Sequence, residues 1–486
     1  MPDDQPTRDG GPDRQFFATE RDPRLRLIIP AGVAVAFLME QLDSTIITTA
    51  IPDIARSLGT TALRMNLAVT AYVLALAVFI PISGWFADRF GARRIFLAAL
   101  VTFTAASALC GMAQSFPMLV ATRALQGVGG AMMIPVGRLI LLRSFPRDQL
   151  FTAMIYMSMP ALIGPVIGPL AGGFITTYIS WRWIFYINIP FGGLGIALAL
   201  RYVEDGRGAA AARFDFRGFL MVGAGLALLQ YGIEEIGRPT IPPAAVAGLL
   251  IAAALLLLTF ALHARRAVAP AVDLTLLRLR SFRIGTLAGG LVRIGMNGVP
   301  FLLPLMFQVG FGMNPAESGT LTFCSSFGAL LIRPLSPRLL RALGFDRVLF
   351  WGAVLGSASV AGFALLQPDT SRWLIAGYVA VFGLVRAIQF MTSNTLSYAD
   401  TPADQLSRAT SLGGVLQQLT VSLGVSLSAM LLGLIAGHGG ALTPAVFHAV
   451  FLLMAIVPLL ALPGFRGLRP EDGVAISGHR RGGSGQ

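Results

Sequence analysis

Long apolar runs follow one another along the chain with only short polar links between them. A helix needs about 20 apolar residues to cross the hydrocarbon core of a bilayer, which is about 30 Å thick. Runs of this length lie at residues 27–51, 65–87, 94–113, 116–142, 151–178, 183–203, 217–236, 242–263, 281–309, 315–336, 346–367, 372–394, 407–436 and 443–464. The sequence therefore predicts an all-α integral membrane protein with fourteen transmembrane helices.

The composition excludes a water-soluble globule, because 55% of the residues are hydrophobic and only 13% are charged. The net charge of +13 comes from arginines in the links, so nucleic acid is not expected as a partner. Cys110 and Cys324 each lie inside an apolar run and are expected to be packing residues, with no disulfide and no metal site. The absence of lysine indicates a GC-rich gene and a bacterial source.

Basic links mark the expected cytoplasmic side, because short loops rich in arginine stay in the cytoplasm. Arginines follow nearly every even-numbered run, beginning with Arg89, Arg93 and Arg94 after the second. Both termini are therefore expected in the cytoplasm, with residues 1–26 as a disordered tail and residues 465–486 as a second tail. The expected location is the inner (plasma) membrane of a bacterium.

Two carboxylates lie inside the first run, within "MEQLDSTIITTAIPDIA". Glu40 and Asp43 are three residues apart and share a helix face, and Asp43 is expected about 12 Å from the outer end. A carboxylate inside the bilayer is costly, which makes it a candidate for function. We predict that Glu40 and Asp43 bind protons.

The fourth run contains "ATRALQGVGGAMMIPVGR", in which Arg123, Gln126, Gly127 and Gly130 share one face. Arg123 is expected about 10 Å below the outer surface, nearly the depth of Asp43. An ion pair between Arg123 and Asp43 is therefore predicted, and protonation of the acid would break it. A purely structural ion pair is the alternative.

The link "GWFADRFGARR" spans Gly84 to Arg94 and lies between the second and third runs. Gly84 and Gly91 are expected to allow close packing and a tight turn, with Asp88 accepting from Arg93, Arg94 or a neighbouring helix N-terminus. Its spacing resembles the signature loop of the major facilitator superfamily. A weaker echo follows the tenth run in "SPRLLRALGFDRVLF".

Glycines and prolines alternate in the fifth run, "LIGPVIGPLAGGF". Gly164, Gly168 and Gly172 predict a smooth packing groove, and Pro165 and Pro169 remove amide donors and are expected to bend the helix. This run resembles the antiporter signature of the exporters in that superfamily, and "WRWIFYINIP" resembles the start of their sixth span.

Taken together, these segments resemble the fourteen-span drug:proton antiporters of the EmrB/QacA type, and most closely the MdtD-type multidrug exporters. The resemblance implies a major facilitator fold with a six-helix bundle at residues 27–203 and another at 281–464. Links and two inserted helices at residues 204–280 would join them. It also implies export of hydrophobic or cationic drugs by alternating access, driven by the proton gradient without a cofactor.

The resemblance assigns a role to each group of residues. Proton coupling is assigned to Asp43 and Arg123. Gating is assigned to the link that holds Gly84, Asp88, Arg89, Gly91, Arg93 and Arg94. The exporter bend is assigned to Gly164, Pro165, Gly168, Pro169 and Gly172.

The substrate cavity is expected to be lined by Gln126, Met132, Met133, Arg293, Asn297, Arg386 and Gln389. Methionine surface suits hydrophobic drugs, whereas arginines inside the bilayer suit a small organic acid. Both substrate classes remain open, and a periplasmic accessory protein is an open question. Glu234 and Glu235 are expected at the membrane interface.

Three other classes of protein are weighed against an exporter. A membrane enzyme is not expected, because the histidines are scattered and no link is long enough for a soluble catalytic domain. A sensor without transport is an alternative. A proton symporter for uptake is another, since the order of steps sets the direction.

Overall fold

The computed structural model describes residues 25–145, 147–204, 214–236, 241–267, 270–332, 335–402, 405–437, 440–469 and 472. The expected tails at residues 1–26 and 465–486 lie almost wholly outside this part of the chain. All of its regular structure is helical, and there is no strand in the described ranges. The prediction of an all-α membrane protein is confirmed.

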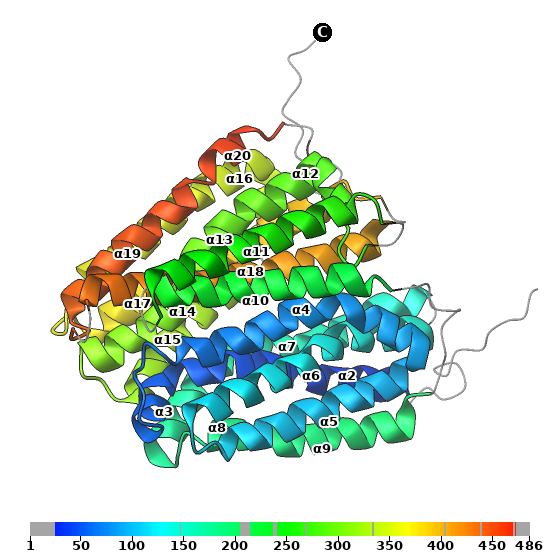
Figure 1. The fold of residues 1–486 in the computed structure, drawn as a ribbon, viewed down its shortest axis with the longest axis horizontal. Helices are drawn as coiled ribbons and strands as arrows, with labels where there is room; N and C mark the ends of the chain where they lie inside the picture. The colour runs from blue at the N-terminus through cyan, green and yellow to red at the C-terminus, as the bar shows by residue number, and fades with distance from the viewer. Residues whose placement is uncertain are drawn as a thin grey trace, which may run out of the picture.

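The first group of helices is formed by the N-terminal part of the chain, coloured blue to cyan-green in Figure 1. In it α2 packs along α7 and α9, and α6 packs against α4 and α5. Its members are α2 (Leu25–Ile46), η1 (Ile47–Thr49), α3 (Ile51–Ser57), α4 (Asn66–Phe90), α5 (Ala92–Gly111), α6 (Phe116–Ser144), α7 (Arg147–Tyr178), α8 (Trp183–Tyr186) and α9 (Asn188–Tyr202).

The second group is formed by the C-terminal part, in which α16 packs against α17 and α19, and α13 against α18 and α19. Its first membrane segment is irregular, since it holds two π-helical turns, η3 and η4. The members are η2 (Leu274–Arg278), α12 (Arg280–Arg283), η3 (Ile284–Ala288), α13 (Gly289–Asn297), α14 (Val299–Leu305), η4 (Met306–Gly310), α15 (Pro315–Leu331), α16 (Ser336–Ala361), η5 (Gly362–Leu365), α17 (Arg372–Ala399), α18 (Leu406–Ala436), α19 (Pro444–Leu459) and α20 (Leu462–Arg466).

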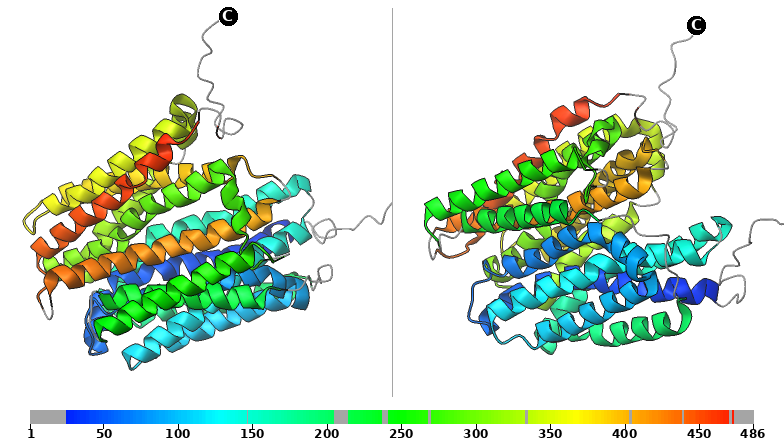
Figure 2. Two further views of the ribbon diagram at one scale, coloured as in Figure 1. Left: turned by 45° about the horizontal axis from the view of Figure 1, so that its top comes forward. Right: turned by 45° about the vertical axis from the view of Figure 1, so that its right-hand side comes forward.

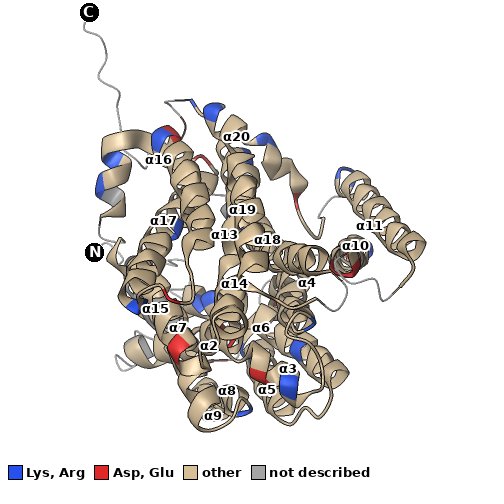
Figure 3. Ribbon diagram, turned by 90° about the vertical axis from the view of Figure 1, so that its left-hand side faces the viewer, with Lys and Arg blue, Asp and Glu red and all other residues tan. Residues whose placement is uncertain are grey.

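Two helices between the groups, α10 (Phe216–Ile236) and α11 (Pro243–Ala264), pack on each other. Viewed along the helices, they lie at one side of the molecule, with α10 beside α4 and α18 (Figure 3). The inserted helix α10 therefore touches one helix of each group.

Twelve of the described helical segments are long and apolar enough to cross a membrane. Two more helices, α7 and α15, lie among them, and α15 packs against both α7 and α17. The predicted number of fourteen transmembrane helices stays a prediction.

The tight turn predicted within "GWFADRFGARR" is present. Asp88 lies in the last turn of α4 and Arg93 in the first of α5, with Gly91 alone between the two helices. Gly91 has φ +96°, a conformation that favours glycine. Gly344 in α16 has φ +78°, so the weak echo in the second half contains the same kind of break.

The expectation that Gly84 allows close packing is wrong. A Cβ atom at Gly84 would meet nothing within 4 Å, and the residue is exposed. Of the two glycines, only Gly91 forms the turn between α4 and α5.

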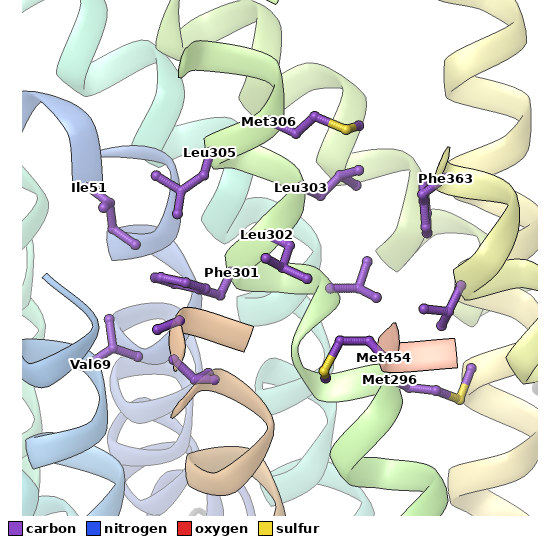
Figure 4. Packing of buried hydrophobic residues seen from close by; sticks show 14 of the residues in the cluster. Ile51, Val69, Met296, Phe301, Leu302, Leu303, Leu305, Met306, Phe363 and Met454 are labelled. Atoms are coloured by element: carbon purple, nitrogen blue, oxygen red, sulfur yellow. The ribbon is translucent and has the colours of Figure 1, made fainter. Parts of the chain in front are cut away.

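The two groups lie closest at one end of the molecule, named here the α3 end, and diverge toward the end at which α2 begins (Figure 1, Figure 2). A continuous apolar cluster crosses between the groups at the α3 end. In Figure 4, Phe301 of α14 lies beside Ile51 and Val69 of the first group. The second end, named the Gly91 end, holds the start of α2 and the end of α20.

Candidate functional site

The centre of the site is the carboxylate of Asp43, inside α2. Arg123 Nη1 donates to its Oδ2 at 2.5 Å, while Gln126 Nε2 donates to its Oδ1 at 2.8 Å. Asn188 Nδ2, from the start of α9, donates to the same Oδ1 at 3.1 Å. Three donors from two other helices thus converge on one carboxylate.

The site is closed to solvent in this conformation. Asp43 is 1% exposed, and Arg123, Gln126 and Asn188 are fully buried. A buried ion pair is maintained only when its geometry is good and further hydrogen bonds satisfy the two ions. The ion pair that the matched depths of Asp43 and Arg123 predicted is therefore present, inside a network of amides.

Arg123 is held by contacts with several helices. Its guanidinium lies over the ring of Tyr72, 4.2 Å from the centroid, and its Nε donates to the carbonyl oxygen of Ala68 at 3.4 Å. Its Nη1 also donates to Gln126 Oε1 at 2.8 Å. Gln126 therefore bridges the acid and the base, and its expected role in a substrate cavity stays a prediction.

Asn188 is itself oriented by a neighbour. Its Nδ2 also donates to Ser107 Oγ of α5 at 3.0 Å, and that hydroxyl donates to the carbonyl oxygen of Phe185 at 2.9 Å. Sequence reasoning missed Asn188, although it stands in "WRWIFYINIP". The signal that could have found it is an amide inside an apolar run.

Glu40 lies one helical turn before Asp43 and is 4% exposed. Within the described residues its Oε2 has no hydrogen-bond partner. The guanidinium of Arg138, on α6, lies near enough to interact electrostatically with Glu40, and it does the same with Tyr398 of α17. Arg138 was not predicted as a site residue.

Three glycines of α7, spaced four residues apart, face α2. A Cβ at Gly164 would lie 2.8 Å from Gln41 Cβ, one at Gly168 2.1 Å from Thr45 Oγ1, and one at Gly172 2.3 Å from the Ile46 carbonyl oxygen. Only glycine permits this approach, so the predicted packing groove is present. It positions the segment of α2 that carries Asp43.

The prolines of α7 leave a carbonyl oxygen free to bond with the second group of helices. Pro169 has no N–H to donate to the carbonyl oxygen of Pro165, four residues earlier. That oxygen accepts instead from Ser326 Oγ of α15, at 2.6 Å. The helix is continuous from Arg147 to Tyr178, and the prolines supply a hydrogen bond between the two groups.

Gly173 and Gly319 make the closest approach between α7 and α15. A Cβ at Gly173 would lie 2.3 Å from the Pro315 carbonyl oxygen, and one at Gly319 2.3 Å from that of Pro169. Ala316 N also donates to Thr177 Oγ1 at 3.0 Å. These contacts close the α3 end.

Asp88, the acid of the predicted gating link, pairs with an arginine from another helix. Arg143 Nη2, at the end of α6, donates to Asp88 Oδ1 at 2.8 Å. Arg93 donates to the carbonyl oxygen of Leu200 in α9. Both contacts join helices of the first group at the Gly91 end, while Arg89 and Arg94 lie on α4 and α5 beside them.

Two predicted cavity arginines lie near the same aromatic ring in the second group. The guanidinium carbons of Arg293 and Arg386 lie 5.5 and 5.8 Å from the centroid of Phe390. Arg293 Nη2 also donates to Asn394 Oδ1 at 2.6 Å. Neither arginine forms a salt bridge with a carboxylate of the described chain.

Other predicted cavity residues lie in packed regions. Met133 is fully buried in the apolar core of the first group, and Met132 packs against that core. Asn297 lies against Gly424 of α18. Gln389 is fully buried beside Gly352 of α16, with no hydrogen-bond partner among the described residues. A substrate cavity lined by these four residues stays a prediction.

No group of three or more histidine, cysteine or acidic side chains suited to a metal ion occurs in the described ranges. Cys110 is fully buried, and its thiol donates to Thr122 Oγ1 at 3.2 Å. The chemistry that the described site offers is therefore ion pairing and hydrogen bonding.

Two groups of membrane helices, two inserted helices and a charged pair buried in the bilayer define a multi-pass membrane transporter. The family model described as Major Facilitator Superfamily matches residues 33–425. The chain belongs to the major facilitator superfamily, and it is a transporter of the inner membrane and not an enzyme.

Relatives of similar length share more than a third of its residues. "Putative multidrug resistance protein MdtD" of Pectobacterium carotovorum is 38% identical over 89% of this chain and 93% of its own. A protein of the same name from Escherichia coli is 36% identical over 92% and 96%. The resemblance predicted from the sequence is confirmed.

Solved structures share the fold at low identity. A mutant of the nucleoside transporter NupG matches with a TM-score of 0.63 and 13% identity, over 91% of this chain and 99% of its own. The human organic anion transporter MFSD10 matches with a TM-score of 0.58 and 15% identity, over 91% and 99%. These likenesses show the major facilitator fold.

Proposed function

We propose that the chain is a proton-coupled antiporter that exports hydrophobic or cationic drugs by alternating access. The observation that carries the proposal is the buried Asp43 carboxylate, which accepts from Arg123, Gln126 and Asn188. The name of the relatives, multidrug resistance protein, supports drugs as the substrate class. An ionised carboxylate is energetically costly at this depth, which makes it a candidate proton-binding group.

Protonation of Asp43 would remove the charge that Arg123 pairs with. The guanidinium then keeps Gln126 Oε1 as an acceptor and the Tyr72 ring as a cation–π partner. These remaining partners lower the free-energy cost of leaving Arg123 without its carboxylate. The contact between α2 and α6 becomes weaker, because it no longer contains an ion pair. A proton thereby changes the packing of α2, which also touches α7, the helix at the junction of the groups.

The test uses proteoliposomes with an imposed pH gradient, in which lumenal pH is followed as ethidium is added. Proton movement opposite to the dye supports antiport, and movement in the same direction would indicate a symporter. Asp43→Asn should abolish proton-driven flux while the protein stays folded, since Gln126 still accepts from Arg123.

Asp53→Asn is the matched control for this experiment. Asp53 lies in α3 at the α3 end, where it pairs with Arg56, whose side chain is 77% exposed. It should transport as the unaltered protein does. Uphill transport that survives in Asp43→Asn, with folding verified by size-exclusion chromatography, would refute the coupling role.

A small organic acid is a second candidate substrate. It is favoured by Arg293 and Arg386, which lie near Phe390 without a carboxylate partner in the described part of the chain. An anion can satisfy both guanidinium groups, which are otherwise costly inside a bilayer. A proton response to citrate and not to ethidium, lost in Arg386→Gln, would select this candidate.

A further inference from the structure

A buried polar cluster joins the inserted helix α10 to both groups of helices. Its acceptor is Glu234 Oε1, which receives hydrogen bonds from Thr70 Oγ1 of α4 at 2.7 Å and from Ser426 Oγ of α18 at 3.2 Å. Gln230 Nε2, one turn earlier on α10, donates to the same oxygen at 3.0 Å. One carboxylate oxygen therefore accepts from three different helices.

The cluster is buried and extends along α18. Thr70, Ser426 and Ser422 are fully buried, Glu234 is 4% exposed and Gln230 is 5% exposed. Ser422 Oγ donates to Gln230 Oε1 at 2.8 Å, and Gln230 Nε2 also donates to Ser426. Glu234 lies in the last turn of α10, and its side chain enters the junction of α4 and α18. The expectation that it lies at the depth of the membrane interface stays a prediction.

This geometry limits how far the two groups can separate at this point. With donor distances of 2.7 and 3.2 Å to one atom, the hydroxyl oxygens of Thr70 and Ser426 lie within about 6 Å of each other. Alternating access requires one bundle to rock against the other. Separation of α4 and α18 here would break at least one of the two bonds and leave a buried group without its partner.

We propose that Glu234 is a latch on the inserted helix that stabilises the conformation in which the two groups are closed at the α3 end. Thr70 is four residues from the start of α4, and that start lies at the α3 end. The cluster thus adds a polar contact to the apolar cluster and the α7–α15 contacts at that end. This inference depends on the transporter fold and not on the identity of the substrate or on proton coupling.

Spin-label distance measurements in lipid nanodiscs test the latch without any substrate. The background carries Cys110→Ala and Cys324→Ala. Labels are placed at Gln114→Cys in the first group and Asp369→Cys in the second, both exposed in short links between helices. In Glu234→Leu the population at longer distance should rise at least about threefold, as expected for the net loss of a buried hydrogen bond.

The matched control is Glu317→Gln. Glu317 also lies at the α3 end, but its ion pair with Arg372, at 2.8 Å, is made inside the second group. It should leave the distance distribution unchanged. If Glu317→Gln produces the same shift as Glu234→Leu, the effect is not specific to the cluster and the proposal fails.

Two milder variants decide the question if Glu234→Leu does not fold. Thr70→Val and Ser426→Ala each remove one donor, from opposite groups, and both should shift the population in the same direction. Polar contacts that merely bind helices together would lower thermal stability and leave the distances as they were. That outcome, in any folded variant of the cluster, would overturn the proposal.

Discussion

The position of Asn188 shows how much one residue contributes to the Asp43 site. It is the third donor to the carboxylate, and Ser107 fixes its orientation. Asn188 comes from α9, whereas the other two donors come from α6. Its amide therefore ties a third helix to the state of Asp43.

We expect Asn188→Leu to lower proton-driven flux by about tenfold, because a buried acceptor that loses a donor costs about 1–3 kcal/mol. The measurement is ethidium-dependent proton movement in proteoliposomes. Ser107→Ala removes only the partner of Asn188 and should have a smaller effect. Flux equal to that of the unaltered protein in Asn188→Leu would show that the amide is not needed.

At this scale the sequence predicts the pair and not its surroundings. The similar depths of Asp43 and Arg123 follow from helix rise and run boundaries. The donors Gln126 and Asn188 depend on how α6 and α9 are rotated about their axes, which packing decides. The same reason explains why Met133, expected in a cavity, is buried in the apolar core of the first group.

Among the helices, α7 packs on a different partner with each of two faces. Gly164, Gly168 and Gly172 pack on α2, whereas Gly173 and the carbonyl oxygens of Pro165 and Pro169 contact α15. The sequence pattern predicts the first face, because glycines every four residues line up on a helix. The hydrogen bond from Ser326 required knowing which helix lies opposite.

Gly319→Ala should push α7 and α15 apart, because its Cβ would lie 2.3 Å from the Pro169 carbonyl oxygen. Overpacking of this kind costs about 1–3 kcal/mol. Thermal unfolding in detergent measures the loss. Gly377→Ala in α17, where a Cβ meets nothing within 4 Å, is the control and should be as stable as the unaltered protein. Equal stability of both variants would contradict the contact.

The inserted pair α10 and α11 is tied at the Gly91 end by Asp215. Its carboxylate accepts from Gly218 N at 2.9 Å and Ala271 N at 3.3 Å, and pairs with His263 Nε2 at 2.8 Å. Burial acts to raise the pKa of Asp215, but these hydrogen bonds outweigh it and the pKa is lowered. The carboxylate is therefore more stable in the folded protein than in the unfolded chain.

Asp215→Asn should lower the free energy of unfolding by about 1–3 kcal/mol at neutral pH. A lowered pKa contributes stability above the unfolded value of about 4, and that stability is lost as the pH falls through the folded value. The difference in free energy of unfolding between Asp215→Asn and the unaltered protein should therefore become smaller below about pH 4. Thermal unfolding across pH measures it, with the exposed Asp369→Asn as control. A gap that is constant with pH would exclude the ionised carboxylate as its cause.

In the whole molecule, the two groups meet at the α3 end and diverge toward the Gly91 end (Figure 1). The contacts at the α3 end include the apolar cluster around Phe301, the α7–α15 contact, and the cluster at Glu234. Alternating access requires these contacts to open together.

A cross-link at the α3 end should therefore stop transport. Thr177→Cys and Ala316→Cys, in a background without Cys110 and Cys324, place thiols where Ala316 N contacts Thr177 Oγ1 at 3.0 Å. Oxidation should lower flux at least about tenfold, and a reductant should restore it. Each single cysteine variant serves as the control. Full transport by the cross-linked protein would mean that this contact does not open.

The sequence by itself determined the membrane class, the approximate bounds of the helices, the family and the pairing of Asp43 with Arg123. Each of these follows from run length, charge and residue spacing, which are local along the chain. The tertiary structure alone decided that α10 lies at the junction of α4 and α18, that Glu234 is buried there, and that Ser326 bonds to Pro165. Such contacts join residues more than a hundred positions apart, and side-chain packing between helices, which no local pattern encodes, brings them together.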